Sequence, residues 1–208
     1  MKHIILIPGL EYDINNWKIT KTNQESVYHY LQSKYNVIDL TLQLDKFKMN
    51  TNDLLQYIDT LIPNESYILA SSFGCVTGLL YTQKYPNKIK GIMLLDPTTS
   101  KQSYRIHNIE DNIIRNNLLE MLRLQEKIKF MNECTIISHV IFPFKKLKNP
   151  DKQVNDDHVF EIFNEHFSFL RQLSHNPKSN IILHPNVSHF IHHYEPEKIK
   201  SNMDYLIN

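Results

Sequence analysis

Residues 66–78 constrain the fold of this chain more than any other stretch. They read Ser-Tyr-Ile-Leu-Ala-Ser-Ser-Phe-Gly-Cys-Val-Thr-Gly, a short apolar strand pattern that passes directly into a helical one. Ala70 and Gly74 stand two residues before and two residues after Ser72. A sharp strand-to-helix turn that exposes a nucleophile needs small residues at those positions, because the flanking chain passes close by. The segment therefore predicts a strand, a tight turn bearing a serine, and a helix.

Two adjacent serines compete for the tip of this turn. With Ser71 at the tip, the small positions would hold Leu69 and Phe73, which are too bulky. With Ser72 at the tip, those positions hold alanine and glycine. Side-chain size therefore selects Ser72 as the candidate nucleophile, and the other interpretation is a structural serine-rich turn of an α/β protein.

Glycine is scarce in the chain, with only 4 among 208 residues, so each position is informative. Gly74 and Gly78 are four residues apart and share one face of the predicted helix, where they would let helix and sheet approach closely. Gly9 ends the first apolar run. We interpret these glycines as positions where the backbone around the turn requires a residue without a side chain.

Short apolar runs alternate with helix-period stretches along the whole sequence, and no repeat or linker divides it. This alternation predicts an α/β fold with a mostly parallel sheet of about six strands, helices on both faces, and one domain over residues 1–208. The last helix is expected to begin at Pro196. The expected strands are His3–Ile7, Asn36–Leu40, Tyr67–Ala70, Ile89–Leu95, Thr135–Phe142 and Asn180–Leu183.

A long helical pattern over residues 109–131 exceeds what a minimal strand–helix repeat needs. It carries an apolar stripe that includes Leu118, Met121 and Leu122. Two interpretations stand side by side: an extended crossover helix packed in the core, or a small helical lid within a cap insertion at residues 97–133.

Composition excludes several classes of function. The formal net charge is +1, so no strong field attracts nucleic acid or a membrane surface, and no apolar run approaches the roughly 18 residues of a membrane span. Cys75 and Cys134 match no metal spacing, and the 11 histidines form no ligand pattern. We expect no metal, no cofactor and a reducing, cytoplasmic setting. The sequence does not indicate an oligomeric state.

The chain resembles the α/β-hydrolase family over nearly its whole length. Its first apolar run ends in Pro8-Gly9-Leu10, which is similar to the strand and oxyanion loop of that family, with Pro8 in place of the usual histidine. The resemblance implies two backbone N–H donors for an oxyanion, those of Leu10 and Phe73. Each such donor typically lowers the barrier by roughly 3 kcal/mol.

The resemblance also implies a histidine base after the last strand, since the family order is nucleophile, acid, histidine. Ser188-His189-Phe190 is similar to the family's Gly-His-Phe, with serine in place of glycine. His189 is therefore the candidate base. Its rivals lie too near the strand or the final helix: His184, His192 and His193.

The acid of the triad is the least defined member. The family commonly carries it shortly after the fifth strand as Asp-x-x-Val, and the first carboxylate there is Asp151, in Asp151-Lys152-Gln153-Val154. Asp156 and Asp157 are alternatives that suit helix capping. Asp96 is another, because some family members take the acid from the end of the fourth strand. Absence of an acid also stays open.

The expected function is a serine hydrolase that cleaves a carboxylic ester or thioester of a small-molecule acyl substrate. Ser72 would form an acyl-enzyme, with His189 as base and Asp151 orienting it. An acyltransferase is the alternative within the same chemistry. A non-catalytic binding protein that keeps the fold is the alternative from another class, and fold alone does not decide between them.

Overall fold

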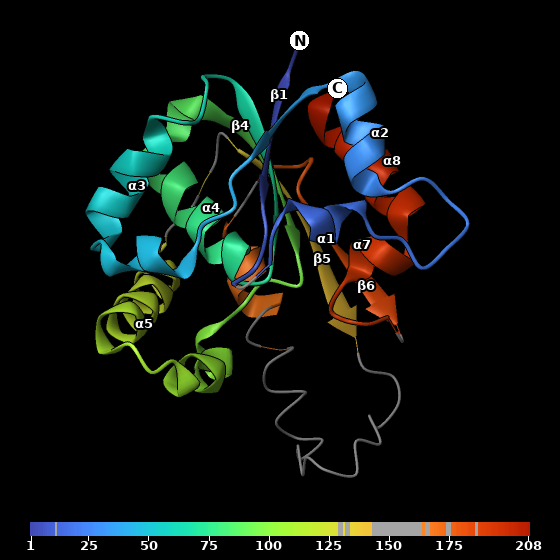
Figure 1. The fold of residues 1–208 in the computed structure, drawn as a ribbon. Coiled ribbons are helices and arrows are strands. Elements are labelled where there is room, and N and C mark those ends of the chain that lie inside the picture. The colour runs from blue at the N-terminus through green and yellow to red at the C-terminus, as the bar shows by residue number, and fades with distance from the viewer. Residues whose placement is uncertain are drawn as a thin grey trace, which may run out of the picture.

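The computed structural model describes residues 1–10, 12–128, 131, 134–142, 164, 167–173, 176–185 and 187–208. One six-stranded sheet runs through the centre, in the order β2-β1-β3-β4-β5-β6, and every neighbouring pair is parallel (Figure 1). The predicted α/β fold is confirmed. The strands are β1 His3–Ile7, β2 Asn36–Asp39, β3 Ser66–Ser71, β4 Ile89–Leu95, β5 Thr135–Phe142 and β6 Asn180–Pro185.

The order of the strands fixes where a site can form. From β1 the chain steps outward to β2, then returns to the other side of β1 and proceeds through β3 to β6. The connections therefore reverse direction between β1 and β3. In open parallel sheets, the loops at such a reversal leave a crevice beyond the carboxyl ends of the strands. Gly9 and Ser72 follow these two strands, so both stand at the crevice.

Helices cover both faces of the sheet because the central strands are apolar throughout. Alternate residues of β1 point to opposite faces: Ile5 and Ile7 join one buried cluster, and Ile4 and Leu6 join the other. The helices on the first face are α3 Thr51–Asp59, α4 Phe73–Lys84, α5 Asn112–Glu126, the 3₁₀ helix η1 Leu44–Lys48 and helical residues 167–173. The helices on the second face are α1 Ile14–Lys18, α2 Val27–Lys34, α7 Ile191–Tyr194 and α8 Pro196–Ile207. Two further 3₁₀ helices are η2 Pro86–Lys88 and η3 Ser100–Asn108.

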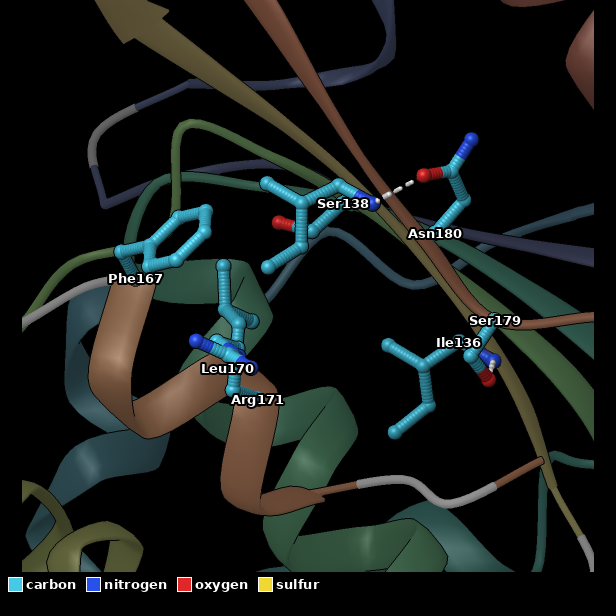
Figure 2. Close-up of a pocket in the computed structure, with 8 residues that line it drawn as sticks. Ile136, Ser138, Phe167, Leu170, Arg171, Ser179 and Asn180 are labelled. Atoms are coloured by element: carbon cyan, nitrogen blue, oxygen red, sulfur yellow. Dashed lines mark hydrogen bonds between the residues drawn. The ribbon is translucent and has the colours of Figure 1, made fainter. Parts of the chain in front are cut away.

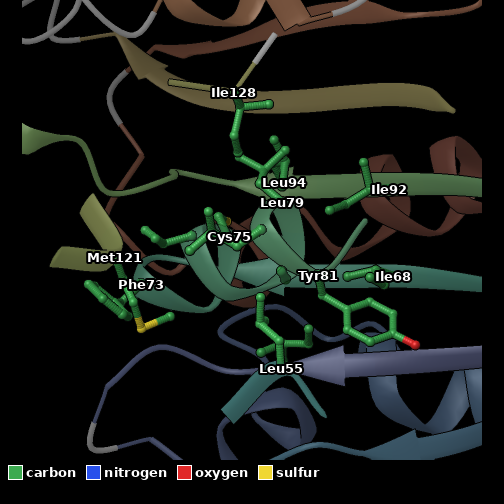
Figure 3. Close-up of a cluster of buried hydrophobic side chains, with 14 of the residues drawn as sticks. Leu55, Ile68, Phe73, Cys75, Leu79, Tyr81, Ile92, Leu94, Met121 and Ile128 are labelled. Atoms are coloured by element: carbon green, nitrogen blue, oxygen red, sulfur yellow. The ribbon is translucent and has the colours of Figure 1, made fainter. Parts of the chain in front are cut away.

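Helix α4 is buried along most of its length, and its glycines explain how (Figure 3). A Cβ added at Gly74 would lie 2.3 Å from the backbone oxygen of Ile7. A Cβ at Gly78 would lie 3.2 Å from a side-chain methyl of Ile92. The two glycines therefore let α4 approach the sheet closely, as their spacing predicted.

The apolar stripe of α5 belongs to the core. Leu118, Met121 and Leu122 are buried in the same cluster as α4, and Figure 3 draws Met121 beside Phe73. This is the packing expected of a crossover helix. The residues just before α5 differ, since Ile106 and Ile109 line a pocket at the carboxyl edge of the sheet. A cap function of residues 97–133 stays a prediction.

Four histidines of the described residues are buried, namely His139, His184, His192 and His193, and burial lowers the pKa of His139 and His192 most. His139 on β5 is fully buried, and His192 on α7 is 1% exposed and packs against the Trp17 ring at 4.4 Å. Burial disfavours the charged imidazolium, so the pKa of each of these two histidines falls from 6.5 to about 3. Both are therefore neutral in the folded protein at ordinary pH.

Replacing Gly74 with alanine should damage folding far more than the same change at Gly78. The Gly74 Cβ would meet rigid backbone, whereas the Gly78 Cβ would meet the tips of side chains. We expect Gly74→Ala to lower the free energy of unfolding by about 3 kcal/mol or more, or to prevent folding, and Gly78→Ala to change it by about 1 kcal/mol at most. Urea unfolding of both variants checks this, and equal losses would contradict the close approach at Gly74.

Stability should fall as the pH drops from 7.5 to 5.0. The unfolded chain binds protons on His139 and His192 below pH 6.5, but the folded protein does so only near pH 3, so acid favours the unfolded state. Within that window each histidine lowers the free energy of unfolding by about 1.4 kcal/mol per pH unit. At pH 5, His139 and His192 together therefore lower it by about 4 kcal/mol. Urea unfolding at the two pH values measures this. The control His107→Gln, at an exposed position, should keep the native dependence, and a flat native profile would refute the burial argument.

Candidate active site

The turn after β3 places Ser72 in an uncommon backbone conformation. Its φ is 52° and its ψ is −126°, directly between the end of β3 and the start of α4. Such a conformation costs a residue with a side chain roughly 1–3 kcal/mol and persists only when its surroundings enforce it. Here the Ser72 N–H donates to Leu95 O at 3.0 Å, and the Cys75 N–H donates to Ser72 O at 3.1 Å. The predicted turn is present, with Ser71 in the strand and Ser72 at the tip.

The residue after β1 supports the same turn from the neighbouring strand. A Cβ added at Gly9 would lie 2.9 Å from Ser72 Cβ and 3.4 Å from its Oγ. Any larger residue at position 9 would therefore press on the serine side chain. The close approach of the two turns follows from the pairing of β1 with β3 in the sheet.

A pocket of about 180 Å³ opens beside Ser72 at the carboxyl edge of the sheet. It brings together four of the residues singled out from the sequence, namely Ser72, His189, Leu10 and Phe73. The Ser72 hydroxyl has Thr98 Oγ1 at 3.4 Å as a hydrogen-bonding partner. The described residues that line it are Leu10, Tyr12, Leu44, Ser72, Phe73, Thr98, Gln102, Ile106, Ile109 and His189.

Phe73 and Leu10 can each offer a backbone N–H at this pocket. Phe73 is the first residue of α4, and the N–H groups of the first turn have no partner within their helix. Leu10 follows Gly9 where β1 has ended. A helix N-terminus also carries partial positive charge, which favours a developing anion. This part of the pocket therefore suits a negatively charged oxygen.

His189 is held by a carboxylate, and that carboxylate is Asp96. The distance from His189 Nδ1 to Asp96 Oδ2 is 2.6 Å, and the two side chains are 28% and 13% exposed. Asp96 follows β4 at a φ of 44°, and its N–H donates to His139 O at 2.8 Å. Since a carboxylate only accepts, Nδ1 of His189 carries the proton in this contact, which makes Nε2 the acceptor nitrogen of a neutral ring.

The other acids considered from the sequence, Asp151, Asp156 and Asp157, lie outside the described residues. Asp96 was one of the candidates because it ends the fourth strand. In the structure Asp96 contacts His189, although the two residues are 93 positions apart in the sequence.

The three rival histidines have other partners and do not line the pocket. His184 Nδ1 lies 2.9 Å from Glu195 Oε2 and its Nε2 lies 2.7 Å from His139 Nδ1. The rings of His192 and His193 both bond to Asn16, through its side chain and its backbone oxygen respectively. Among the four histidines of this segment, His189 alone is placed at the pocket.

Sequence reasoning gave a cap over residues 97–133, which contains four residues of the pocket wall, as one of two interpretations, but it did not single out Thr98, Gln102 or Ile106 and did not anticipate Leu44. Thr98, Gln102, Ile106 and Ile109 come from the segment between β4 and α5, and Leu44 comes from η1. Position was the available signal, because segments that follow strands at the carboxyl edge line such a crevice. Their individual contacts depend on how η3 folds back over the edge.

A larger cavity of about 340 Å³ lies elsewhere, between helical residues 167–173 and strands β5 and β6 (Figure 2). Phe167 and Leu170 reach it from the helix, and Ile136 and Ser138 reach it from β5. It contains neither Ser72 nor His189. We therefore place the candidate active site in the smaller pocket, where the reactive groups converge.

Within the described residues, no group of three or more His, Cys, Asp and Glu side chains could hold a metal ion. Cys75 and Cys134 are buried free thiols, and burial raises the pKa of the Cys134 thiol to about 12. No helix of the described chain is long and apolar enough to cross a membrane.

No family model matches this sequence, and no curated protein matches it significantly. Solved structures do resemble it. The hydrolase olei00960 from Oleispira antarctica superposes with a TM-score of 0.65 at 11% identity, covering 100% of this chain and 91% of its own. Mouse alpha/beta hydrolase domain-containing protein 10 gives a TM-score of 0.63 at 13% identity, covering 99% and 89%.

A third similar structure is a monoacylglycerol lipase from Paleococcus ferrophilus, with a TM-score of 0.60, 11% identity and coverage of 99% and 93%. These three structural neighbours are hydrolases. At such low identities the likeness shows the fold, and it covers between 89% and 93% of the three solved structures. The chain has the α/β-hydrolase fold.

Proposed function

We propose that this protein is a serine hydrolase that cleaves carboxylic esters or thioesters through an acyl-enzyme on Ser72. The observation that carries the proposal is the convergence of Ser72 and an Asp96-held His189 on one pocket. A carboxylate at 2.6 Å fixes the tautomer and orientation of the imidazole, as general base catalysis requires. A protein that only binds ligands has no need of this arrangement, so catalysis is favoured over a binding function.

The reaction would proceed in two steps, formation of the acyl-enzyme and its hydrolysis. In the first, His189 Nε2 takes the Ser72 hydroxyl proton while Oγ attacks the acyl carbon, and the proton then passes to the departing alcohol or thiol. In the second, His189 takes a proton from water as the water oxygen attacks the acyl-enzyme. The carboxylic acid leaves and Ser72 regains its proton. The N–H groups of Leu10 and Phe73 would stabilise the oxyanion of each tetrahedral intermediate.

Ser72 should be the residue that reacts with a fluorophosphonate. We expect one phosphonyl group per chain, located on the peptide containing Ser72 by mass spectrometry, because the reagent needs an activated serine. Ser71→Ala is the matched control and should still be labelled, since Ser71 lies in β3. Equal labelling of Ser72→Ala, or labelling of another residue, would overturn the assignment of the nucleophile.

Asp96→Asn should reduce kcat for p-nitrophenyl butyrate by about 10³–10⁴-fold, because the amide no longer stabilises the required tautomer of His189. Asp151→Asn is the matched control, and we expect it to leave kcat within about twofold. A panel of p-nitrophenyl esters at saturating concentration measures both variants. The opposite result, a large loss in Asp151→Asn and none in Asp96→Asn, would return the acid to the segment after β5.

A further inference from the structure

Buried polar side chains form a series of contacts that begins at His139, the residue whose carbonyl oxygen accepts from the Asp96 N–H. His139 Nδ1 lies 2.7 Å from His184 Nε2, and His184 Nδ1 lies 2.9 Å from Glu195 Oε2. Both imidazoles are fully buried, between the carboxyl-terminal parts of β5 and β6. Lys198 Nζ, at 3.3 Å, is the charged group that faces Glu195. None of these residues lines the pocket of Ser72.

One proton arrangement satisfies both hydrogen bonds. The Glu195 carboxylate only accepts, so His184 Nδ1 must carry a proton. Burial lowers the pKa of His184 and of His139, so both rings are neutral. His184 Nε2 is then an acceptor, and His139 Nδ1 donates to it. This leaves His139 Nε2 as a buried acceptor with no hydrogen-bond partner among the described residues, a cost that calls for an explanation.

The chain of contacts closes a ring around the candidate acid and base. The Asp96 N–H donates to His139 O, and the His139 ring connects through His184 to Glu195. Glu195 caps the end of α7, the short helix that follows His189, through its N–H to Ile191 O at 2.9 Å. The bond from His189 to Asp96 completes the ring. The buried histidine rings therefore join β5, whose backbone accepts from the Asp96 N–H, to Glu195 at the end of the short helix that follows His189.

We propose that His139, His184 and Glu195 form a positioning relay that fixes the Asp96 turn relative to the His189 loop. This role rests on the proposed function of Ser72, His189 and Asp96. The relay acts on Asp96 and, among the described residues that line the pocket, on His189 alone, so its loss lowers kcat and spares KM. Catalytic groups must be held within about 0.5 Å of the productive geometry. Buried, directional hydrogen bonds such as those of the relay can hold them there.

The test compares His139→Leu with His139→Asn and Ile137→Ala. Asparagine keeps a donor near the position of Nδ1, whereas leucine removes it. Ile137 lies on the same strand and face and is 1% exposed, so Ile137→Ala weakens β5 without touching the relay. We expect kcat for p-nitrophenyl butyrate to fall at least 10-fold in His139→Leu with KM within twofold, as a displacement approaching 1 Å can cost about 10²-fold. His139→Asn should stay within about threefold of the native kcat, and Ile137→Ala within about threefold after correction for the folded fraction.

Proton NMR of the resting protein supplies a readout that does not depend on turnover. The proton on His189 Nδ1, whose nitrogen lies 2.6 Å from Asp96 Oδ2, should give a sharp downfield signal in the native protein and in His139→Asn. The signal should broaden or vanish in His139→Leu. Equal kcat losses in His139→Leu and Ile137→Ala, or an unchanged signal in His139→Leu, would overturn the relay. A native protein that neither turns over esters nor reacts with fluorophosphonate, yet shows the expected NMR pattern, would refute the proposed function alone.

Discussion

The close approach of α4 to the end of β1 is the contact on which the site depends. The backbone oxygens of Ile7 and Pro8 lie where a Cβ of Gly74 would have to stand. This approach brings the turn at Ser72 against Gly9, so the candidate nucleophile, the first amide of α4 and the end of β1 meet at one place. The strained φ of Ser72 is maintained by this packing, because strained residues persist only where the surrounding structure enforces them.

The reversal of strand order turns that local contact into a pocket. Since all six strands are parallel, the residues that follow them gather at one edge of the sheet. Ser72 follows β3, Asp96 follows β4 and His189 follows β6. The segment after Asp96 then supplies Thr98, Ile106 and other wall residues. Local geometry thus places Ser72 at the tip of a turn, and the topology of the sheet supplies the residues around it.

The sequence predicts the parts of this site that have a local cause. Ser72 could be chosen over Ser71 because side-chain size at two neighbouring positions decides the turn. The strand pattern likewise predicted all six strands, because covered parallel strands are apolar throughout. The contact between Asp96 and His189 has no such local signature. It joins residues 93 apart and depends on a positive φ at an aspartate. The family pattern favoured a carboxylate after the fifth strand, whereas the contact with His189 that the described residues show comes from Asp96.

Backbone strain gives an independent reason to assign the site to Ser72 and Asp96. Among the described residues, three non-glycine residues have a positive φ: Glu65, Ser72 and Asp96. Glu65 precedes β3, at the amino edge of the sheet, where it turns the chain into the strand. The other two follow the neighbouring strands β3 and β4 at the carboxyl edge, and the Ser72 N–H bonds to Leu95, the residue just before Asp96. Each strained residue therefore helps to hold the other. Two strained residues that follow neighbouring strands and lie at one pocket are the pattern expected at a functional site, where backbone strain is tolerated at the expense of stability.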